Sequence, residues 1–367
     1  MGDEDDEAPR GSPPVPMAPV HGDLTADGVL VADEAEASTL RNKGAYGETL
    51  PQGRLRLSFL EAAYLVEAGR LLLSRRGAPV SFRDLARLAH RGDAEFEITY
   101  VVYRDLRSRG YVVEQGTAPI DFRVHPRGGR PGKTQTKTWV SALSERDPFR
   151  LADLLDRVRH VQGLRRQLLV GVVDEESDLT YYAAREVQPS GTVRVGKAQA
   201  SADLFADRAL VAEEDQARAL SEAGHFGKFL GARLQLSLLE TAYLMAHGAL
   251  EVRSARSERP VPKEEVVRRA RRRQADFDLR LRVYADLRER GILVKTGYKY
   301  GTHFRAYEGD PERVHAKYLV HALPAGHRGG WPEVSRGVRL AHGVKKQLLL
   351  ASVGEAIAYL DLSRVRP

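Results

Sequence analysis

Residues 57–65 have the sequence LSFLEAAYL, which returns as LSLLETAYL at residues 236–244, almost half the chain length later. Three more segments recur at nearly the same spacing: 44–48 as 224–228, 102–107 as 283–288, and 165–169 as 345–349. Solenoid repeats are far shorter, with periods of about 20–50 residues. The recurrence therefore indicates a duplicated and fused globular subunit, with a pseudo-two-fold interface between the two copies.

The first part of each copy is predicted to be mainly helical. Ser58 with Glu61, and Ser237 with Glu240, have capping-box spacing, in which the two side chains satisfy free N–H groups at a helix start. Apolar residues follow each serine at helical spacing. The other predicted helix boundaries are stops at Gly69 and Gly248, starts near Ser81 and Pro262, and stops at Gly110 and Gly291.

The second part of each copy changes to strand-like alternation. In the second copy, a helix from about Pro332 to Gly343 interrupts strands predicted at residues 292–295, 303–307, 318–323 and 348–353, and a hairpin at 354–355 leads into 357–360. The fold class is thus mixed α/β (α+β), in two tandem repeats. The predicted divisions are a disordered leader at 1–21, N-terminal subdomains at 22–113 and 191–294, and mixed-sheet subdomains at 114–190 and 295–367.

Composition limits the functional classes. The chain of 367 residues is 42% hydrophobic and has no Cys, which excludes disulfides, thiolate metal sites and a Cys nucleophile. No apolar run reaches the roughly 20 residues of a membrane span, and the acidic first residues do not resemble a secretory signal. We therefore expect a cytoplasmic protein. The net charge of +7 favours a polyanionic partner, and it does not distinguish RNA from DNA or an acidic protein.

Three residues of the second copy are candidates for catalysis. A predicted strand ends at Tyr307, a loop rich in turn formers follows, and a second strand is predicted to start at His315. Lys346 comes after the predicted helix and directly before a core strand. This order predicts that the three side chains meet at one edge of the sheet.

The stretch around these residues resembles the archaeal and eukaryotic tRNA-splicing endonuclease family. Its catalytic subunits have a K-x-G-x-x-[FY]-G-x-x-F-x-x-Y segment, seen here from Lys295 to Tyr307, then H-x-x-Y at His315, then a lysine before an apolar strand. The resemblance extends from about Gly22 to the end and implies the fused archaeal type that works as a homodimer. It further implies that each mixed-sheet subdomain is nuclease-like. The implied roles are general base for Tyr307, general acid for His315 and stabilisation of the phosphorane for Lys346.

The chemistry of these residue types suits RNA cleavage without a metal or other cofactor. The reaction must deprotonate a ribose 2′-OH, stabilise charge on phosphorus and protonate the leaving 5′ oxygen, so the products would carry 2′,3′-cyclic phosphate and 5′-hydroxyl ends. A tyrosine is a poor base at its ordinary pKa of about 10 unless nearby cations lower that pKa. The acidic residues Glu308, Asp310 and Glu312 would suit a metal-dependent nuclease, but they crowd one loop without a D…E-x-K arrangement.

The first copy has lost all three candidate residues. Alignment of the copies places His125 opposite Tyr307, Gln135 opposite His315 and Arg166 opposite Lys346. We therefore predict a noncatalytic first copy, one active site per chain and two per homodimer.

Two further features have roles implied by the family. The acidic turn Asp174, Glu175, Glu176 and Asp178 would enter a basic groove of the catalytic unit and hold the assembly together, although a solvated turn is the alternative. Arg339, with Arg364 or Arg366, would sandwich an unpaired RNA base. The run Arg268–Arg273 is compatible with either a phosphate-contacting face or a solvated helix.

The leading hypothesis is a homodimeric tRNA-intron endonuclease that cuts precursor tRNA at bulge-helix-bulge sites by transesterification, with no membrane association. Its competitor is a noncatalytic RNA-binding or scaffold subunit, which the presence of Tyr307, His315 and Lys346 disfavours. A weaker third hypothesis is a metal-dependent DNA nuclease.

Overall fold

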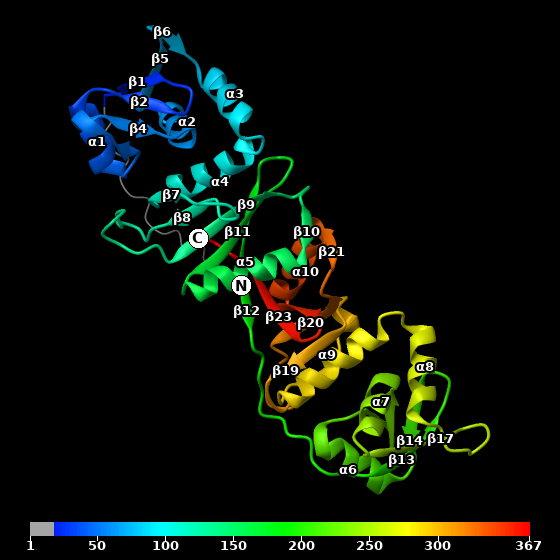
Figure 1. Ribbon diagram of the computed structural model, residues 1–367. Helices are drawn as coiled ribbons and strands as arrows, with labels where there is room; N and C mark the ends of the chain where they lie inside the picture. The colour runs from blue at the N-terminus through cyan, green and yellow to red at the C-terminus, as the bar shows by residue number, and fades with distance from the viewer. Residues whose placement is uncertain (1–17) are drawn as a thin grey trace, which may run out of the picture. The chain divides into compact units, whose positions relative to one another are not determined.

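A computed structural model describes residues 18–367 in two compact units. The first unit holds the described residues 18–115 with 124–135, and the second holds 116–123 with 136–367 (Figure 1). Most of the predicted leader, residues 1–17, lies outside the described residues, and the first strand already begins at Val20. Within the described part, no helix is long and apolar enough to cross a membrane.

The first unit is built on a sheet that, within its described residues, has six strands in the order β3-β4-β2-β1-β5-β6. The strands are β1 (Val20–Leu24), β2 (Val29–Val31), β3 (Glu48–Thr49), β4 (Leu55–Leu57), β5 (Leu71–Arg75) and β6 (Ala78–Val80). The remaining elements are α1 (Glu34–Gly44), the 3-10 turn η1 (Pro51–Gly53), α2 (Phe59–Glu67), α3 (Phe82–Gly92), α4 (Phe96–Ser108) and β7 (Val113–Gln115).

The N-terminal part of the second copy repeats this plan inside the second unit. Its described residues form a five-stranded sheet, β15-β16-β14-β13-β17. The elements are β13 (Ala200–Leu204), β14 (Arg208–Val211), α6 (Glu214–Gly224), β15 (Lys228–Leu230), β16 (Arg233–Ser237), α7 (Leu238–Ala246), β17 (Leu250–Ser254), α8 (Lys263–Arg273) and α9 (Phe277–Glu289).

The helix predictions for these parts are confirmed. Ser58 and Ser237 each form a complete capping box with the glutamate three residues later. Gly69 and Gly248 follow the ends of α2 and α7 with φ values of 66° and 68°, the left-handed region that glycine enters without steric cost. The two sheets were not predicted, because strands of two to five residues give too short an alternation to detect.

The second unit also contains a larger sheet, in which its strands run in the order β18-β19-β20-β22-β23-β12-β11-β9. The first copy provides β8 (Phe122–Val124), β9 (Thr138–Ser144), β10 (Pro148–Arg150), α5 (Leu151–Gly163), β11 (Gln167–Val173) and β12 (Leu179–Val187). The second copy provides β18 (Leu293–Thr296), the 3-10 turn η2 (Tyr298–Tyr300), β19 (Phe304–Tyr307), β20 (Tyr318–Pro324), β21 (Arg328–Gly330), α10 (Trp331–Gly343), β22 (Gln347–Val353) and β23 (Ile357–Val365).

One strand boundary was predicted wrongly. Of the two starts predicted for the strand after the loop, Tyr318 is confirmed and His315 is wrong. Tyr318 pairs with Ala306 near the end of β19, so the register would set His315 opposite Gly309. The chain leaves the sheet after Tyr307 and turns at Asp310, whose carbonyl accepts from Arg313 N. No strand therefore lies opposite His315.

The predicted pseudo-two-fold interface between the copies is confirmed by the strand register. Strands β12 and β23 pair antiparallel, with Ala184 opposite Leu362, which occupy equivalent positions in the two copies. The short strands β10 and β21 pair in the same way, with Phe149 opposite its equivalent Gly329. Helices α5 and α10 share one core on a single face of the sheet, and α9 packs with residues of the opposite face (Figure 1).

Candidate active site

The ends of three neighbouring strands bring the predicted catalytic segments together. Lys317 N donates to Ala306 O over 3.0 Å, beside the end of β19. Gln347 N, at the start of β22, donates to Lys317 O over 2.9 Å. Tyr307 is the last residue of β19, His315 precedes this connection, and Lys346 directly precedes Gln347. The register thus places the backbones of all three at one edge of the large sheet.

Tyr307 is fixed by packing. Phe304 and Ala306 belong to the core that α9 shares, so strand alternation turns Tyr307 to the other face. There it forms a small apolar cluster with Leu293, Ala316 and Val193, and only 8% of the residue is exposed. The Arg305 guanidinium carbon lies 5.8 Å from the Tyr307 ring centroid. A cation therefore stands close to the phenol.

His315 is exposed and lies in the irregular segment between β19 and β20. Within residues 18–367 its imidazole has no hydrogen bond or ion pair, which leaves both ring nitrogens accessible to a ligand. The segment itself is anchored on either side of His315. Glu308 accepts from Lys317 Nζ over 2.7 Å and from the Tyr318 hydroxyl over 2.8 Å.

These contacts also account for Glu308, one of the acidic residues of the loop. Burial acts to raise the pKa of Glu308, but the hydrogen bonds from Lys317 and Tyr318 outweigh it and hold this pKa below its usual range. The hydrogen bond that Lys317 donates to this carboxylate raises the pKa of Lys317 in turn. Glu308 is therefore an ionised structural partner of Lys317. In the part of the chain that the structure describes, no three His, Cys, Asp or Glu side chains gather as a metal site.

Lys346 is positioned by the turn that ends α10. Lys345 has a φ of 54°, and this left-handed residue redirects the chain from the helix into β22. Lys346 Nζ donates to Val344 O over 3.1 Å and lies 5.8 Å from the Tyr300 ring centroid. Among the described residues it has no carboxylate partner. Its charge thus remains available to an anionic ligand.

The segment that connects the two copies passes beside this edge, a feature that sequence analysis missed. Thr192 N donates to Glu308 O over 2.8 Å, and Val193 N donates to Gly291 O over 2.9 Å. Val193 also packs in the cluster of Tyr307. Residues 188–191, Gln-Pro-Ser-Gly, have the composition of an ordinary loop. Their contacts depend on tertiary packing, so no local pattern could have revealed them.

Lys295, the first residue of the quoted motif, joins the two parts of the second copy. Its Nζ donates to Gly227 O over 2.9 Å, while Gly227 N donates to Glu240 Oε1, also over 2.9 Å. Burial lowers the pKa of Lys295, and the nearby Glu240 carboxylate opposes that effect. This lysine is therefore structural and links the N-terminal sheet of the second copy to the large sheet.

The equivalent of Tyr307 in the first copy has a different environment. His125 is 2% exposed, its Nδ1 lies 2.9 Å from Thr134 Oγ1, and its Nε2 lies 3.0 Å from Glu114 Oε2. These partners occupy both ring nitrogens. Arg166 precedes β11 as Lys346 precedes β22, so the scaffold persists where the residue types have changed.

The acidic turn has a defined shape. It connects β11 to β12, and the Asp174 carboxylate accepts from Glu176 N over 3.0 Å and from Asp178 N over 2.8 Å. Glu175 pairs with Arg146 over 2.6 Å, but both side chains are mostly exposed. Its carboxylates thus face outward on an ordered hairpin.

The two predicted base-binding arginines lie on different elements. Arg339 is exposed on α10, and Arg364 is exposed on β23. Because Leu348 pairs with Leu362, the register sets Arg364 level with Lys346 at the same end of the sheet. Arg366 lies beyond the strand. This geometry favours Arg364 over Arg366 as the residue near the site.

Comparisons with known proteins agree with the duplication. The model of the tRNA intron endonuclease N-terminal domain matches residues 20–86 and 200–267, and that of its catalytic C-terminal domain matches 96–181 and 277–359. Similar proteins include tRNA-splicing endonucleases from Methanococcoides burtonii, 36% identical over 95% of this chain and 100% of the relative, and Methanosarcina acetivorans, 39% over 94% and 99%. That of Natronomonas pharaonis is 34% identical over 93% and 98%.

Proposed function

Since this chain belongs to the tRNA intron endonuclease family and so cuts introns from precursor tRNA, we propose that it does so at bulge-helix-bulge sites by metal-independent transesterification. The observation that carries the proposal is the strand register, which aligns the segments of Tyr307, His315 and Lys346 at one edge. The first copy has none of these residues at the matching positions. Each chain would thus have one active site.

The proposed reaction needs three groups. Tyr307 accepts the proton of the ribose 2′-OH, whose oxygen forms a bond to phosphorus. His315 donates a proton to the 5′ oxygen as its bond to phosphorus breaks, and Lys346 stabilises the charge on the five-coordinate phosphorus. The products are a 2′,3′-cyclic phosphate and a 5′-hydroxyl. The exposed imidazole of His315 and the unpaired charge of Lys346 support these roles.

RNA recognition is proposed for Arg339 and Arg364. Guanidinium groups stack on unpaired bases, and a base splayed from a bulge would reach exposed arginines beside the cut site. The strand register sets Arg364 level with Lys346, which supports the proposal that Arg364 contacts such a base. The absence of Cys from the chain supports the cytoplasm as the place of the reaction.

A homodimer is the proposed assembly, in which the acidic turn of one chain enters a basic groove of its partner. The second copy has a cavity of about 750 Å³ whose lining includes Lys228, Arg273, Arg280, Lys295 and Arg305. The turn with Asp174, Glu175, Glu176 and Asp178 has the opposite charge. The matching turn of the second copy, Gly-Glu-Ala at residues 354–356, is nearly uncharged.

The assembly proposal is tested by charge reversal. Asp174 holds the turn through two backbone N–H groups, so Glu175→Lys, Glu176→Lys and Asp178→Lys should be combined while Asp174 is kept. We expect the mass on a sizing column to fall from dimer to monomer, whereas Glu355→Lys should leave it unchanged. An unchanged mass for the triple variant would contradict the proposal.

Catalysis is tested with an intron-bearing precursor tRNA in EDTA, for the wild type beside His315→Ala. We expect cleavage by the wild type only, with cyclic phosphate ends in mass spectrometry, and no cleavage of a fully paired RNA. Equal cleavage by both proteins would sink the assignment of His315. If the wild type does not cleave the RNA when no other protein is present, a noncatalytic RNA-binding subunit is favoured instead.

A further inference from the structure

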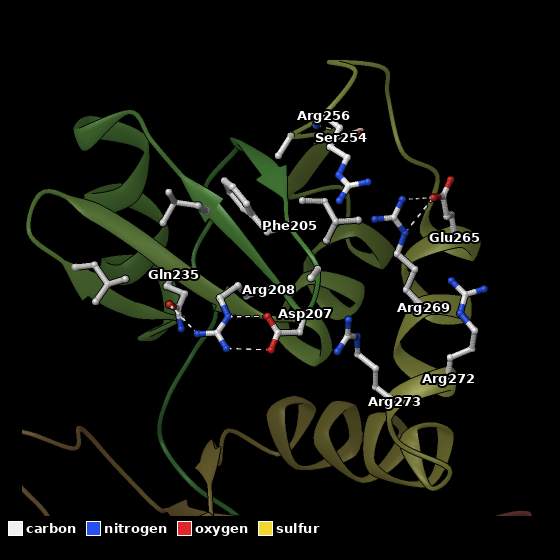
Figure 2. A pocket seen from close by; sticks show the side chains of 15 residues that line it. Phe205, Asp207, Arg208, Gln235, Ser254, Arg256, Glu265, Arg269, Arg272 and Arg273 are labelled. Carbon is white, nitrogen blue, oxygen red and sulfur yellow. Dashed lines mark hydrogen bonds and ion pairs between the residues drawn. The ribbon is translucent and has the colours of Figure 1, made fainter.

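A pocket lined by arginines lies in the N-terminal part of the second copy, on the α8 side of its sheet. The cavity measures about 1100 Å³ and is bordered by the start of β14, the loop after β17 and one face of α8. Figure 2 shows the guanidinium groups of Arg256, Arg269 and Arg273 facing the space between the sheet and α8. We propose that this pocket binds backbone phosphates of the RNA substrate at a distance from the cut, an inference that rests on the proposed function.

The charges of the lining leave a net positive excess. Among the described residues, the pocket lining has five arginines but only two carboxylates, those of Asp207 and Glu265. Arg208 is bound to Asp207 through two contacts of 2.8 and 3.0 Å, and Arg269 is bound to Glu265. In the part of the chain that the structure describes, Arg256, Arg272 and Arg273 have no carboxylate partner. These three charges are available to a ligand.

The first copy shows that these arginines are not required by the fold. Helices α3 and α8 have the same length and the same place in the two copies. Leu88 and Gly92 occupy the positions of Arg269 and Arg273, and among the pocket arginines of α8 only Arg272 is matched by an arginine, Arg91. Outside the helix, Gly28 stands for Arg208, and Gly77 follows β5 as Arg256 follows β17. The full set of five lining arginines is therefore found only in the copy that carries Tyr307, His315 and Lys346.

The chemistry of the pocket fits the phosphodiester backbone of an RNA strand. Arginine presents a planar fork of donors that matches phosphate oxygens. A cavity of about 1100 Å³ exceeds what one free phosphate fills, so several phosphates of one RNA strand would share it. Phe205 and Leu230 also line it and are 47% and 55% exposed, which gives ribose and base edges an apolar surface. An RNA backbone uses both kinds of surface.

The arginine run of α8 divides between two faces. Arg269, Arg272 and Arg273 line the pocket, and Glu265 shares their face. Arg271 points elsewhere and pairs with Asp278 over 2.9 Å. Helical spacing thus separates the ligand-facing arginines from one that stabilises the packing of α8 on α9.

The test uses arginines that do not line the groove proposed for the acidic turn. Arg256 and Arg272 meet this condition, whereas Arg208 and Arg273 line both cavities. The double variant Arg256→Gln/Arg272→Gln is made in a His315→Ala background, so that bound precursor tRNA stays intact. Its matched control is Arg87→Gln/Arg91→Gln, which removes two exposed charges from the equivalent helix α3.

The readout is the affinity for precursor tRNA as a function of KCl concentration. Each phosphate contact adds about 0.7–0.9 to the slope of log affinity against log salt. We expect the double variant to lose between one and two units of slope and about tenfold in affinity at low salt. The control should keep both values. In the wild-type background, the single-turnover cleavage rate at subsaturating enzyme should fall with the affinity in the double variant and stay unchanged in the control.

A slope equal to that of the control would overturn the inference. If a loss of dimer mass on a sizing column accompanied that slope, the pocket would receive an acidic protein segment instead. Failure of the wild type to cut RNA in EDTA would refute the proposed catalysis, and the salt dependence would still decide the role of the pocket.

Discussion

Arg185 Nη2 lies 2.6 Å from Asp361 Oδ2, and the two residues face each other where β12 of the first copy pairs with β23 of the second. Asp361 is 1% exposed, while the Arg185 side chain is 49% exposed. Within the described residues, Asp361 Oδ1 has no hydrogen bond. Arg185 therefore supplies the positive charge that offsets the buried carboxylate of Asp361 at the junction of the copies.

Arg185→Ala should lower the free energy of unfolding by about 2 kcal/mol, because it leaves Asp361 buried without a countercharge. The half exposure of Arg185 keeps the cost below that of a fully buried pair. Urea denaturation measures the change. Arg159→Ala is the matched control, since Arg159 is equally exposed but pairs with the less buried Glu186, and it should cost less than about 1 kcal/mol. Equal losses for both variants would refute the role given to Arg185.

Lys346→Ala should reduce the single-turnover cleavage rate about 100- to 1000-fold, the usual effect of losing one group that stabilises transition-state charge. Arg166→Ala removes the equivalent residue of the first copy and should leave the rate within about twofold. Melting temperatures within about 2 °C of the wild type would show that both variants remain folded. If Arg166→Ala lowered the rate as much as Lys346→Ala, the first copy would take part in the chemistry.

Gly191→Ala should disturb the edge that carries Tyr307. A Cβ at this position would lie 2.3 Å from the backbone oxygen of Gly291, so one of the two segments must move. We expect a loss of about 1–3 kcal/mol in unfolding free energy. The cleavage rate should fall as well, because Val193 of the same segment packs against Tyr307.

Gly196→Ala is the control for this steric effect, as its Cβ would lie 3.5 Å from Ala223 Cα, an ordinary contact. It should leave unfolding and cleavage unchanged. Similar losses in the two alanine variants would mean that linker flexibility, and not the contact with Gly291, is responsible.

His303 should make the protein less stable in mild acid. Burial, with the neighbouring Arg280, lowers the pKa of His303 to about 4, and its Nδ1 accepts from Ala322 N over 3.0 Å, which requires an unprotonated nitrogen. The unfolded chain, with an ordinary pKa near 6.5, binds the proton more readily. The stabilisation is therefore complete above about pH 6.5 and is lost as the pH falls from about 6.5 towards 4.

Between pH 8 and pH 5, His303 should account for a loss of about 1–2 kcal/mol, with allowance for partial exposure. Urea unfolding of the wild type and of His303→Asn at both pH values gives this contribution by difference. Asparagine retains an acceptor for Ala322 N but does not titrate. If both proteins lost the same free energy between the two pH values, His303 would not be the titrating group.

Local signals predicted the helices well because each acts within one turn of chain. The serine–glutamate boxes at Ser58 and Ser237 and the stops at Gly69 and Gly248 depend on neighbouring residues alone. Strand starts depend on partners distant in the sequence. His315 is irregular because no residue lies opposite it after β19 ends, a property that its own neighbours do not encode.

The candidate site could be predicted because its residues belong to a signal in the sequence itself. Its surroundings could not be predicted, because they depend on contacts between distant segments. Tyr307, His315 and Lys346 stand in a long motif and are absent from the first copy, so the comparison of copies isolates them. The contacts of Val193 with Tyr307 and of Lys295 with Gly227 join segments that are distant in the sequence. Only the tertiary register of the linker and of the two sheets creates them.

The alignment of Ala184 with its equivalent Leu362 determines which halves prefer each other. Two separate second copies, joined by the same register, would set Asp361 opposite Ser363, so the buried acid would have no basic residue opposite it. Two first copies would set Arg185 opposite Ala183. Only the unlike pair combines Arg185 with Asp361. Divergence after duplication has thus turned a symmetric contact into a heterotypic one, so halves expressed as separate polypeptides should sort into mixed pairs.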